Sequence, residues 1–322
     1  MIDFLHVANG SSTTATIEAA RIPGAVSIWA DPLHDGPVPG GLTDAELLEV
    51  RARHLGGSDE RSFSDTVAGL QAWRQVIVEL DAYGELVLWY EHDLFCQLNL
   101  IQVLTWIDEH LPASKPVSLI CIDSHPGHPA FKGLGELTPL ELAPLFGDRH
   151  PVTEAQTALA AAAWRAFREP TPEPLDRLRR SDTSALPYLA AALTGLFREY
   201  PWTTDGLSRS ERRLLQLIAD GSPTLTDAFP YMDDGQRAYY MTGTALFDLA
   251  EALAASTPPL MTISPGDALR RAAAVTPEGR GVLAGTLDRV ALCGLDRWVG
   301  GVHLHRGNQW RWNEESQTVG PA

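Results

Sequence analysis

The stretch ELVLWYEHDLFCQLNLIQVLTWI, residues 85–107, decides how this chain folds. Residues 85–90 form a nearly continuous apolar run of strand length, which ends at the polar triplet Glu91-His92-Asp93. Apolar residues then return at helical spacing, at Leu94, Leu98, Ile101, Leu104 and Ile107. A strand without polar alternation that leads straight into a helix is typical of a parallel sheet with both faces covered.

Three further apolar runs of strand length surround this segment. They occupy residues 2–8, 25–29 and 117–122. Helical segments separate them, one from Thr43, where Glu46 completes a capping box, and one over residues 64–83. The alternation predicts an α/β domain with a mainly parallel, Rossmann-like sheet over residues 1–150.

The rest of the chain divides into two parts. Residues 151–204 are rich in Ala and Leu, which predicts a helical connector. Residues 205–322 contain helix starts at Ser208, which has a capping box, and at Thr276, which has proline at the first helical position.

The end of the chain has the pattern of a β-hairpin. Its two arms are residues 300–304 and 310–312, with the turn at Arg306-Gly307-Asn308. Helices followed by a hairpin predict a winged-helix-like domain over residues 205–322. Arginine between tryptophans at residues 310–312 fits either contact with nucleic acid or packing of the aromatic side against the helices.

The net charge of −16 is concentrated in the first part of the chain. Residues 1–150 carry 8 Lys and Arg against 21 Asp and Glu, whereas residues 205–322 carry 11 against 14. Such an acidic surface repels phosphate backbones, so the first domain is a poor candidate for sequence-independent nucleic-acid binding. The arginine pairs Arg212-Arg213 and Arg270-Arg271 leave room for a local basic face in the last domain.

Several classes of protein are disfavoured by the sequence. No apolar run approaches the ~20 residues that a membrane-spanning helix needs. The N-terminal segment lacks the basic and apolar regions of a targeting signal, so we expect a cytoplasmic protein that does not bind membranes. Cys96, Cys121 and Cys293 are widely spaced without a CxxC pair, which predicts buried apolar residues rather than disulfides or zinc ligands.

Polar side chains gather where each predicted strand ends. Ligands of open parallel sheets bind beyond the carboxyl ends of the strands, so these positions predict the site. The candidate ligand-binding residues are His6, Asn9, Gly10, Ser11, Ser12, Asp31 and Asp123. The candidate catalytic residues are His34, Asp35, Glu91, His92 and Asp93.

Each strand end allows a functional and a structural interpretation. The loop Asn9–Ser12 can hold a phosphate or carboxylate on backbone N–H groups, although it matches neither a P-loop nor GxGxxG and can be an ordinary turn. His34 or His92 can act as general acid or base, with the neighbouring carboxylates orienting it or holding a cation. Asp31 and His34 can instead stabilise a proline-rich loop, and Asp93 is the residue best placed to cap the following helix.

A divalent metal is an open alternative for the same residues. His and carboxylate ligands suit zinc, manganese or iron, but the sequence contains no HExxH or similar local motif. The fourth strand end adds His125 and His128 beside Asp123, in a His-Pro-Gly-His segment that can also be a plain surface turn. The metal, if any, is left unassigned by the sequence.

Two groups of motifs resemble known families. The runs at residues 6–12, 29–39 and 89–98 are similar to the signature segments of a bacterial family, domain of unknown function 1835. Residues 207–211, 276–280 and 296–304 resemble its frequent downstream companion, domain of unknown function 3658. The resemblance implies a bacterial cytoplasmic protein and no particular reaction.

Two functions are consistent with these features. The first is an enzyme of hydrolysis or group transfer, or a binder, that takes a small phosphorylated or nucleotide-like ligand at the carboxyl edge of the sheet. The second is a ligand-sensing regulatory protein whose C-terminal domain binds DNA or a protein partner.

Overall fold

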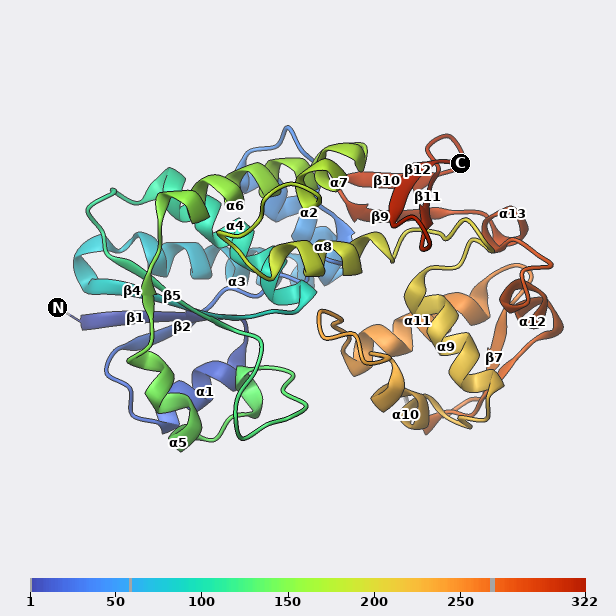
Figure 1. The fold of residues 1–322 in the computed structure, drawn as a ribbon, viewed down its shortest axis with the longest axis horizontal. Coiled ribbons are helices and arrows are strands. Elements are labelled where there is room, and N and C mark those ends of the chain that lie inside the picture. The colour runs from blue at the N-terminus through green and yellow to red at the C-terminus, as the bar shows by residue number, and fades with distance from the viewer. Residues whose placement is uncertain (1, 58–59, 267–269) are drawn as a thin grey trace. The chain divides into compact units, whose positions relative to one another are not determined.

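The structure, a computed structural model, describes residues 2–57, 60–266 and 270–322. The chain forms two compact units (Figure 1). The first unit comprises Met1–Ala192 and returns for Gly300–Val302, and the second comprises Leu193–Val299 and His303–Ala322. The three-part division at residues 150 and 204 stays a prediction, and residues 151–192 pack with the first unit.

A five-stranded sheet forms the centre of the first unit. Its strands are β1 (Ile2–Ala8), β2 (Ala25–Ile28), β4 (Tyr83–Glu91), β5 (Val117–Ile122) and β6 (His150–Pro151). The order is β2-β1-β4-β5-β6, in which the first four strands are parallel and β6 runs antiparallel to β5. This confirms the α/β class with a mainly parallel sheet.

Helices cover both faces of this sheet (Figure 1). On one face lie α1 (Ser11–Ala19) and α5 (Pro139–Leu142), and on the other lie α2 (Asp44–Gly56), α3 (Glu60–Val78), α4 (Leu94–His110) and α6 (Glu154–Phe167). The remaining elements are α7 (Glu173–Arg179), α8 (Leu189–Phe197), the short strand β3 (Gly36–Pro37) and the 3-10 turns η1 (Leu80–Ala82), η2 (Leu134–Glu136) and η3 (Ala143–Phe146). Because the sheet is covered twice, β4 needs apolar side chains on both faces, as its sequence indicates.

Helix α4 is buried on every side between residues 94 and 107. Its polar side chains therefore need partners inside the protein. Gln102 Oε1 accepts a hydrogen bond of 2.8 Å from Trp29 Nε1, and Gln97 Nε2 donates one of 2.7 Å to the backbone oxygen of Glu91. These bonds tie α4 to the ends of β2 and β4.

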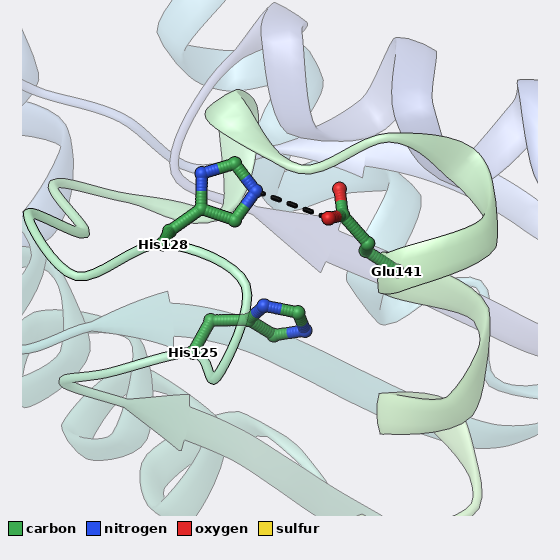
Figure 2. Close-up of side chains that lie close together, drawn as sticks. All are labelled: His125, His128 and Glu141. Carbon is green, nitrogen blue, oxygen red and sulfur yellow. Dashed lines mark hydrogen bonds and ion pairs between the residues drawn. The ribbon is translucent and has the colours of Figure 1, made fainter.

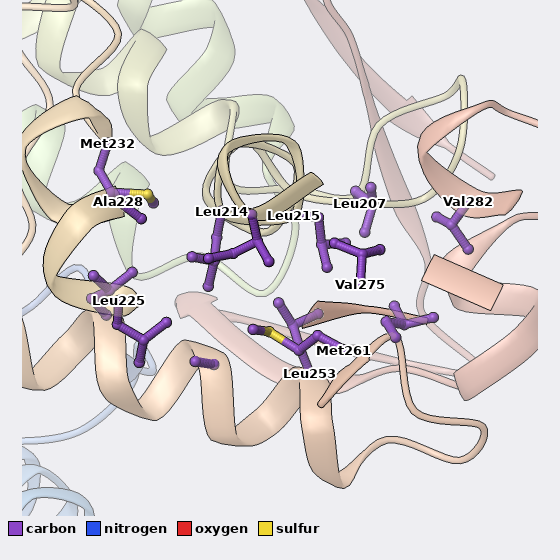
Figure 3. Packing of buried hydrophobic residues seen from close by; sticks show 14 residues of the cluster. Leu207, Leu214, Leu215, Leu225, Ala228, Met232, Leu253, Met261, Val275 and Val282 are labelled. Atoms are coloured by element: carbon purple, nitrogen blue, oxygen red, sulfur yellow. The ribbon is translucent and has the colours of Figure 1, made fainter. Parts of the chain in front are cut away.

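The second unit is built around a helical core (Figure 3). Its helices are α9 (Arg209–Ala219), α10 (Leu225–Ala228), α11 (Gly243–Ala255), α12 (Pro277–Leu283) and α13 (Arg289–Cys293), with η4 (Phe229–Tyr231) after α10. Leu214 of α9, Leu225 of α10 and Leu253 of α11 pack together, and Met261 closes the cluster from a strand. That strand, β7 (Met261–Ile263), pairs antiparallel with β8 (Ala273–Val275).

The predicted C-terminal hairpin is present only at its turn. His305 and Asn308 form an antiparallel bridge with backbone hydrogen bonds of 3.2 Å and 2.9 Å, but the two predicted arms do not pair with each other beyond it. Strand β10 (Val302–His305) is hydrogen-bonded to β9 (Asp296–Gly300), and β11 (Trp310–Asn313) pairs with β12 (Thr318–Pro321). The turn between β9 and β10 lies at Gly300-Gly301. Gly300 has a φ of 59° there, a conformation that glycine adopts without strain. The two predicted arms therefore belong to different sheets.

Other sequence expectations hold in the structure. The capping boxes at Thr43 and Ser208 are present, and Thr276 caps α12 with Pro277 at the first helical position. Among the described residues, no helix combines the length and apolar character that crossing a bilayer requires. All three cysteines are free thiols. Cys96 is buried as expected, whereas Cys121 and Cys293 are half-buried.

Candidate functional site

The order of the strands reverses between β1 and β4. From β1 the chain passes through α1 to β2 on one side, and from β4 it passes through α4 to β5 on the other. The helices α1 and α4 lie on opposite faces of the sheet (Figure 1). Ligands of open α/β sheets bind at such a reversal, so we expect a ligand site at the ends of β1 and β4.

Glu91, at the end of β4, is hydrogen-bonded to the segments that follow β1, β4 and β5. Its Oε2 accepts a hydrogen bond of 2.5 Å from Asn9 Nδ2, beyond β1, and one from Cys96 Sγ, at the start of α4. Its Oε1 accepts a bond of 2.6 Å from the backbone N–H of Leu134, in the segment after β5. The side chains predicted at the ends of β1 and β4 therefore do meet at one edge of the sheet.

Burial changes the ionisation of this glutamate. Glu91 is only 2% exposed, and its removal from water raises its pKa to about 8, with the nearby charge of Asp93 acting in the same direction. The hydrogen bonds from Cys96 and Leu134 oppose this rise without cancelling it. Burial and the charge of Asp93 therefore favour the neutral form of Glu91, which can donate a proton.

Asp93 has the structural role that its position predicts. Its side chain accepts a hydrogen bond of 2.8 Å from the backbone N–H of Cys96, and it caps α4. Burial raises the pKa of Asp93 to about 6. Glu91, Asp93 and Cys96 each offer one donor atom within 4.8 Å of the others, so a cation bound there would have to displace the protons of Glu91 and Cys96.

The first turn of α1 lies at the same edge of the sheet, directly after the end of β1. Its N-cap is Gly10, which supplies no side chain to the free N–H groups, and Ser11 and Ser12 are exposed. The side chain of Asn9 is oriented by a hydrogen bond of 3.2 Å from Thr13 Oγ1. Free N–H groups at the positive end of a helix attract anions, so this turn can hold a phosphate or carboxylate.

His6 lies inside β1 rather than at its end. Its Nδ1 accepts a hydrogen bond of 3.1 Å from Trp89 Nε1, and its Nε2 lies 3.1 Å from the backbone oxygen of Pro23. Both ring nitrogens thus have protein partners, and burial lowers the pKa of this imidazole. The structure gives His6 a packing role in the sheet.

The loop after β2 is organised by a buried arginine. Arg51 Nη2 lies 2.7 Å from Asp31 Oδ1, and both side chains are almost inaccessible to water. Arg51 also donates to the backbone oxygens of Pro32 and Asp35. The carboxylate of Asp31 therefore stabilises the loop by pairing with Arg51.

His34 and Asp35, the two other candidates of this loop, have different partners. His34 is half-buried with its ring 6.0 Å from that of Phe95 in the first turn of α4, and burial lowers its pKa to about 4. Asp35 is exposed and bonds to His54 Nε2 at 3.0 Å, which lowers the pKa of Asp35. His34 is a neutral imidazole near α4 at pH 7, and Asp35 belongs with His54.

His92 and Asp123 complete the predicted set. His92 is buried, and its ring lies 6.3 Å from the rings of Phe131 and Tyr188. Asp123 is half-buried and accepts a hydrogen bond of 2.9 Å from Ser124 Oγ. Both residues lie at the predicted edge.

Comparison with known proteins adds no family. A scan against protein-family models finds no match for this chain, and neither does a search of curated proteins. The resemblance to the two domains of unknown function therefore stays a prediction.

Two residues of this region were missed from the sequence. Arg51 lies in a helix, 20 positions from Asp31, and nothing local marks it as the partner of that carboxylate. Cys96 was interpreted as an apolar residue, yet its thiol bonds to Glu91. Its place three residues after the cap is the one local signal, because that position faces back toward the strand end.

Proposed function

We propose that the Rossmann-like first unit is an enzyme that binds a small phosphorylated or nucleotide-like molecule where β1 and β4 end, and that it catalyses hydrolysis or group transfer. The observation that carries this proposal is the buried Glu91, which Asn9 and the backbone N–H of Leu134 hold at the reversal of strand order. A carboxylic acid kept neutral at pH 7 is suited to protonate a leaving group.

The roles divide between the two strand ends. The N–H groups of the first turn of α1 bind the anionic group of the ligand, beside the exposed Ser11 and Ser12. Glu91 supplies the proton. Because the backbone of Leu134 covers Glu91 and bonds to it, the segment around Leu134 has to move when the ligand enters.

A charge placed at the helix start tests the binding step. Ser12→Asp puts a carboxylate beside the proposed anion site, whereas Ala15→Asp puts the same charge on an exposed position one turn further along α1. Nucleoside phosphates and sugar phosphates should raise the melting temperature of the wild type and of Ala15→Asp, and not that of Ser12→Asp. Equal stabilisation of all three proteins, or of none, contradicts the proposal.

A second candidate function rests on the order of elements in the second unit. Helix α9, the segment at Thr224, α10, α11, β7 and β8 follow one another, and Thr224 forms an antiparallel β-bridge with Ala272 just before β8. This is the order of a winged helix, with α11 in the place of the recognition helix and β7 and β8 in the place of the strands of the wing. It supports a regulatory protein that senses a ligand through its first unit.

The charges of this module favour a protein partner over DNA. Helix α11 contains Asp248 and Glu251 and no lysine or arginine. Several arginines of the second unit have partners within it: Arg212 pairs with Asp205, Arg213 with Asp234 and Arg271 with Glu251, and Arg297 donates to the backbone oxygen of Glu199. Gel-shift assays with operator-length duplexes test this, since tight DNA binding would reverse the preference.

A further inference from the structure

Two histidines stand side by side in the turn that follows β5. The backbone N–H of His128 donates to the backbone oxygen of His125 at 2.9 Å, which closes the segment His125-Pro126-Gly127-His128 into a tight turn. The two residues also form an antiparallel β-bridge. Their rings lie 5.6 Å apart on one side of the turn (Figure 2).

Glu141 of α5 approaches the same two rings (Figure 2). Its Oε2 is the acceptor of a capping box, with bonds of 2.9 Å from Thr138 N and 2.8 Å from Thr138 Oγ1. These bonds fix the side chain and direct Oε1 toward His128 Nε2, 3.3 Å away.

The spacing of these atoms resembles that of metal ligands. A charge-assisted N–H···O bond is about 2.8 Å long, whereas two ligands on one tetrahedral zinc ion lie about 3.3 Å apart. The donor atoms of His125, His128 and Glu141 all lie within 4.8 Å of one another.

Gly127 keeps the space between the ligands open. A Cβ atom at Gly127 would lie 3.0 Å from Glu141 Oε1 and 3.5 Å from His125 Nδ1. The φ angle of Gly127 is not in the left-handed region, so the backbone does not require glycine there. A side chain at position 127 would instead occupy the space beside Glu141 and His125.

We propose that His125, His128 and Glu141 form a binding site for a divalent transition-metal ion of the zinc type. Two imidazoles and one carboxylate suit zinc, cobalt or nickel better than magnesium or calcium, which prefer oxygen ligands. Three protein ligands leave a fourth position for water, as in catalytic zinc sites. The site is independent of the anion-binding role proposed for α1.

Metal titration of the whole protein tests this site. The protein is stripped with a chelator, and Zn²⁺ is added in competition with a chromophoric chelator. We expect one equivalent to bind, and we expect Co²⁺ to give the visible absorption of a tetrahedral ion. His128→Ala should weaken Zn²⁺ binding about tenfold or more, while His150→Ala, at an exposed histidine of β6, should leave it unchanged.

Two variants separate metal binding from folding. Gly127→Ala keeps all three ligands and fills the space between them, so it should weaken Zn²⁺ binding while circular dichroism stays that of the wild type. Glu141→Gln keeps a capping-box residue and removes the charged ligand, so it should act in the same direction. Less than one equivalent of Zn²⁺, or wild-type affinity in folded His128→Ala and Gly127→Ala, would overturn the proposal.

Discussion

Replacing Arg51 should strongly lower the free energy of unfolding of the first unit. Arg51→Met leaves the Asp31 carboxylate buried without its cation, and breaking a buried ion pair costs about 3–5 kcal/mol. Urea unfolding measures this change in the free energy of unfolding. The matched control is Arg61→Met, because Arg61 is 91% exposed and lies 4.0 Å from Asp65, a pair worth about 0–1 kcal/mol. Equal effects of the two changes would contradict a structural role for Arg51.

Glu91 should make stability depend on pH in an unusual direction. Its pKa is about 8 in the folded protein against 4.5 for the free group, so its contribution to stability is lost as the pH rises between these values. Each unit of difference in pKa corresponds to roughly 1.4 kcal/mol. Urea unfolding of the wild type between about pH 5 and pH 8 should show this fall, and Glu91→Gln should flatten it.

The exposed Glu49 of α2 provides the control for this measurement. Glu49→Gln should keep the slope of the wild type. A slope that is the same in all three proteins would mean that Glu91 is ionised in the folded state, and it would remove the proton donor from the proposed mechanism.

At the scale of elements, two helices contain a glycine with opposite surroundings. In α12 a Cβ at Gly279 would lie 2.0 Å from the backbone oxygen of Leu260, so Gly279→Ala should cost about 1–3 kcal/mol. In α3 nothing lies within 4 Å of a Cβ at Gly69, so Gly69→Ala should stabilise by about 0.5–1 kcal/mol. Thermal unfolding of both variants gives the signs, and two changes of the same sign would be inconsistent with this packing.

The elements that sequence predicts well are those whose signal is local. The strand over residues 83–91 is visible because a doubly covered strand is apolar along its length, and helix starts are visible because caps act within one turn. The pairing of the last strands is not local. The backbone N–H of Trp312 bonds to the oxygen of Pro201, more than 100 positions away, which no hairpin pattern contains.

The same distinction applies to the candidate site. The edge where polar residues gather could be predicted, since parallel strands end on one side of a sheet. Their individual roles could not, because His6 and Asp31 are engaged by Trp89 and Arg51, whose positions depend on the folded chain. Residue type alone does not distinguish a packed histidine from a reactive one.

For the whole molecule, charge sets the expectation for nucleic acids. The net charge of −16 repels the phosphate backbone of nucleic acids, and Arg212, Arg213 and Arg271 of the second unit are paired with its own carboxylates. Fluorescence anisotropy with a labelled random duplex at about 100 mM salt should show no binding at micromolar protein. Binding that weakens steeply with salt would instead reveal a basic face and favour DNA as the partner of the second unit.

The return of Gly300–Val302 to the first unit has a consequence for synthesis on the ribosome. The N–H of Gly301 bonds to the oxygen of Phe167, and the oxygen of Gly300 accepts from Val38. A nascent chain that ends at Ala192 lacks both partners, so the first unit cannot complete its folding until Leu193–Val299 has been translated and Val302 has left the exit tunnel. The unit that is translated first thus completes its folding only after most of the second unit has been synthesised.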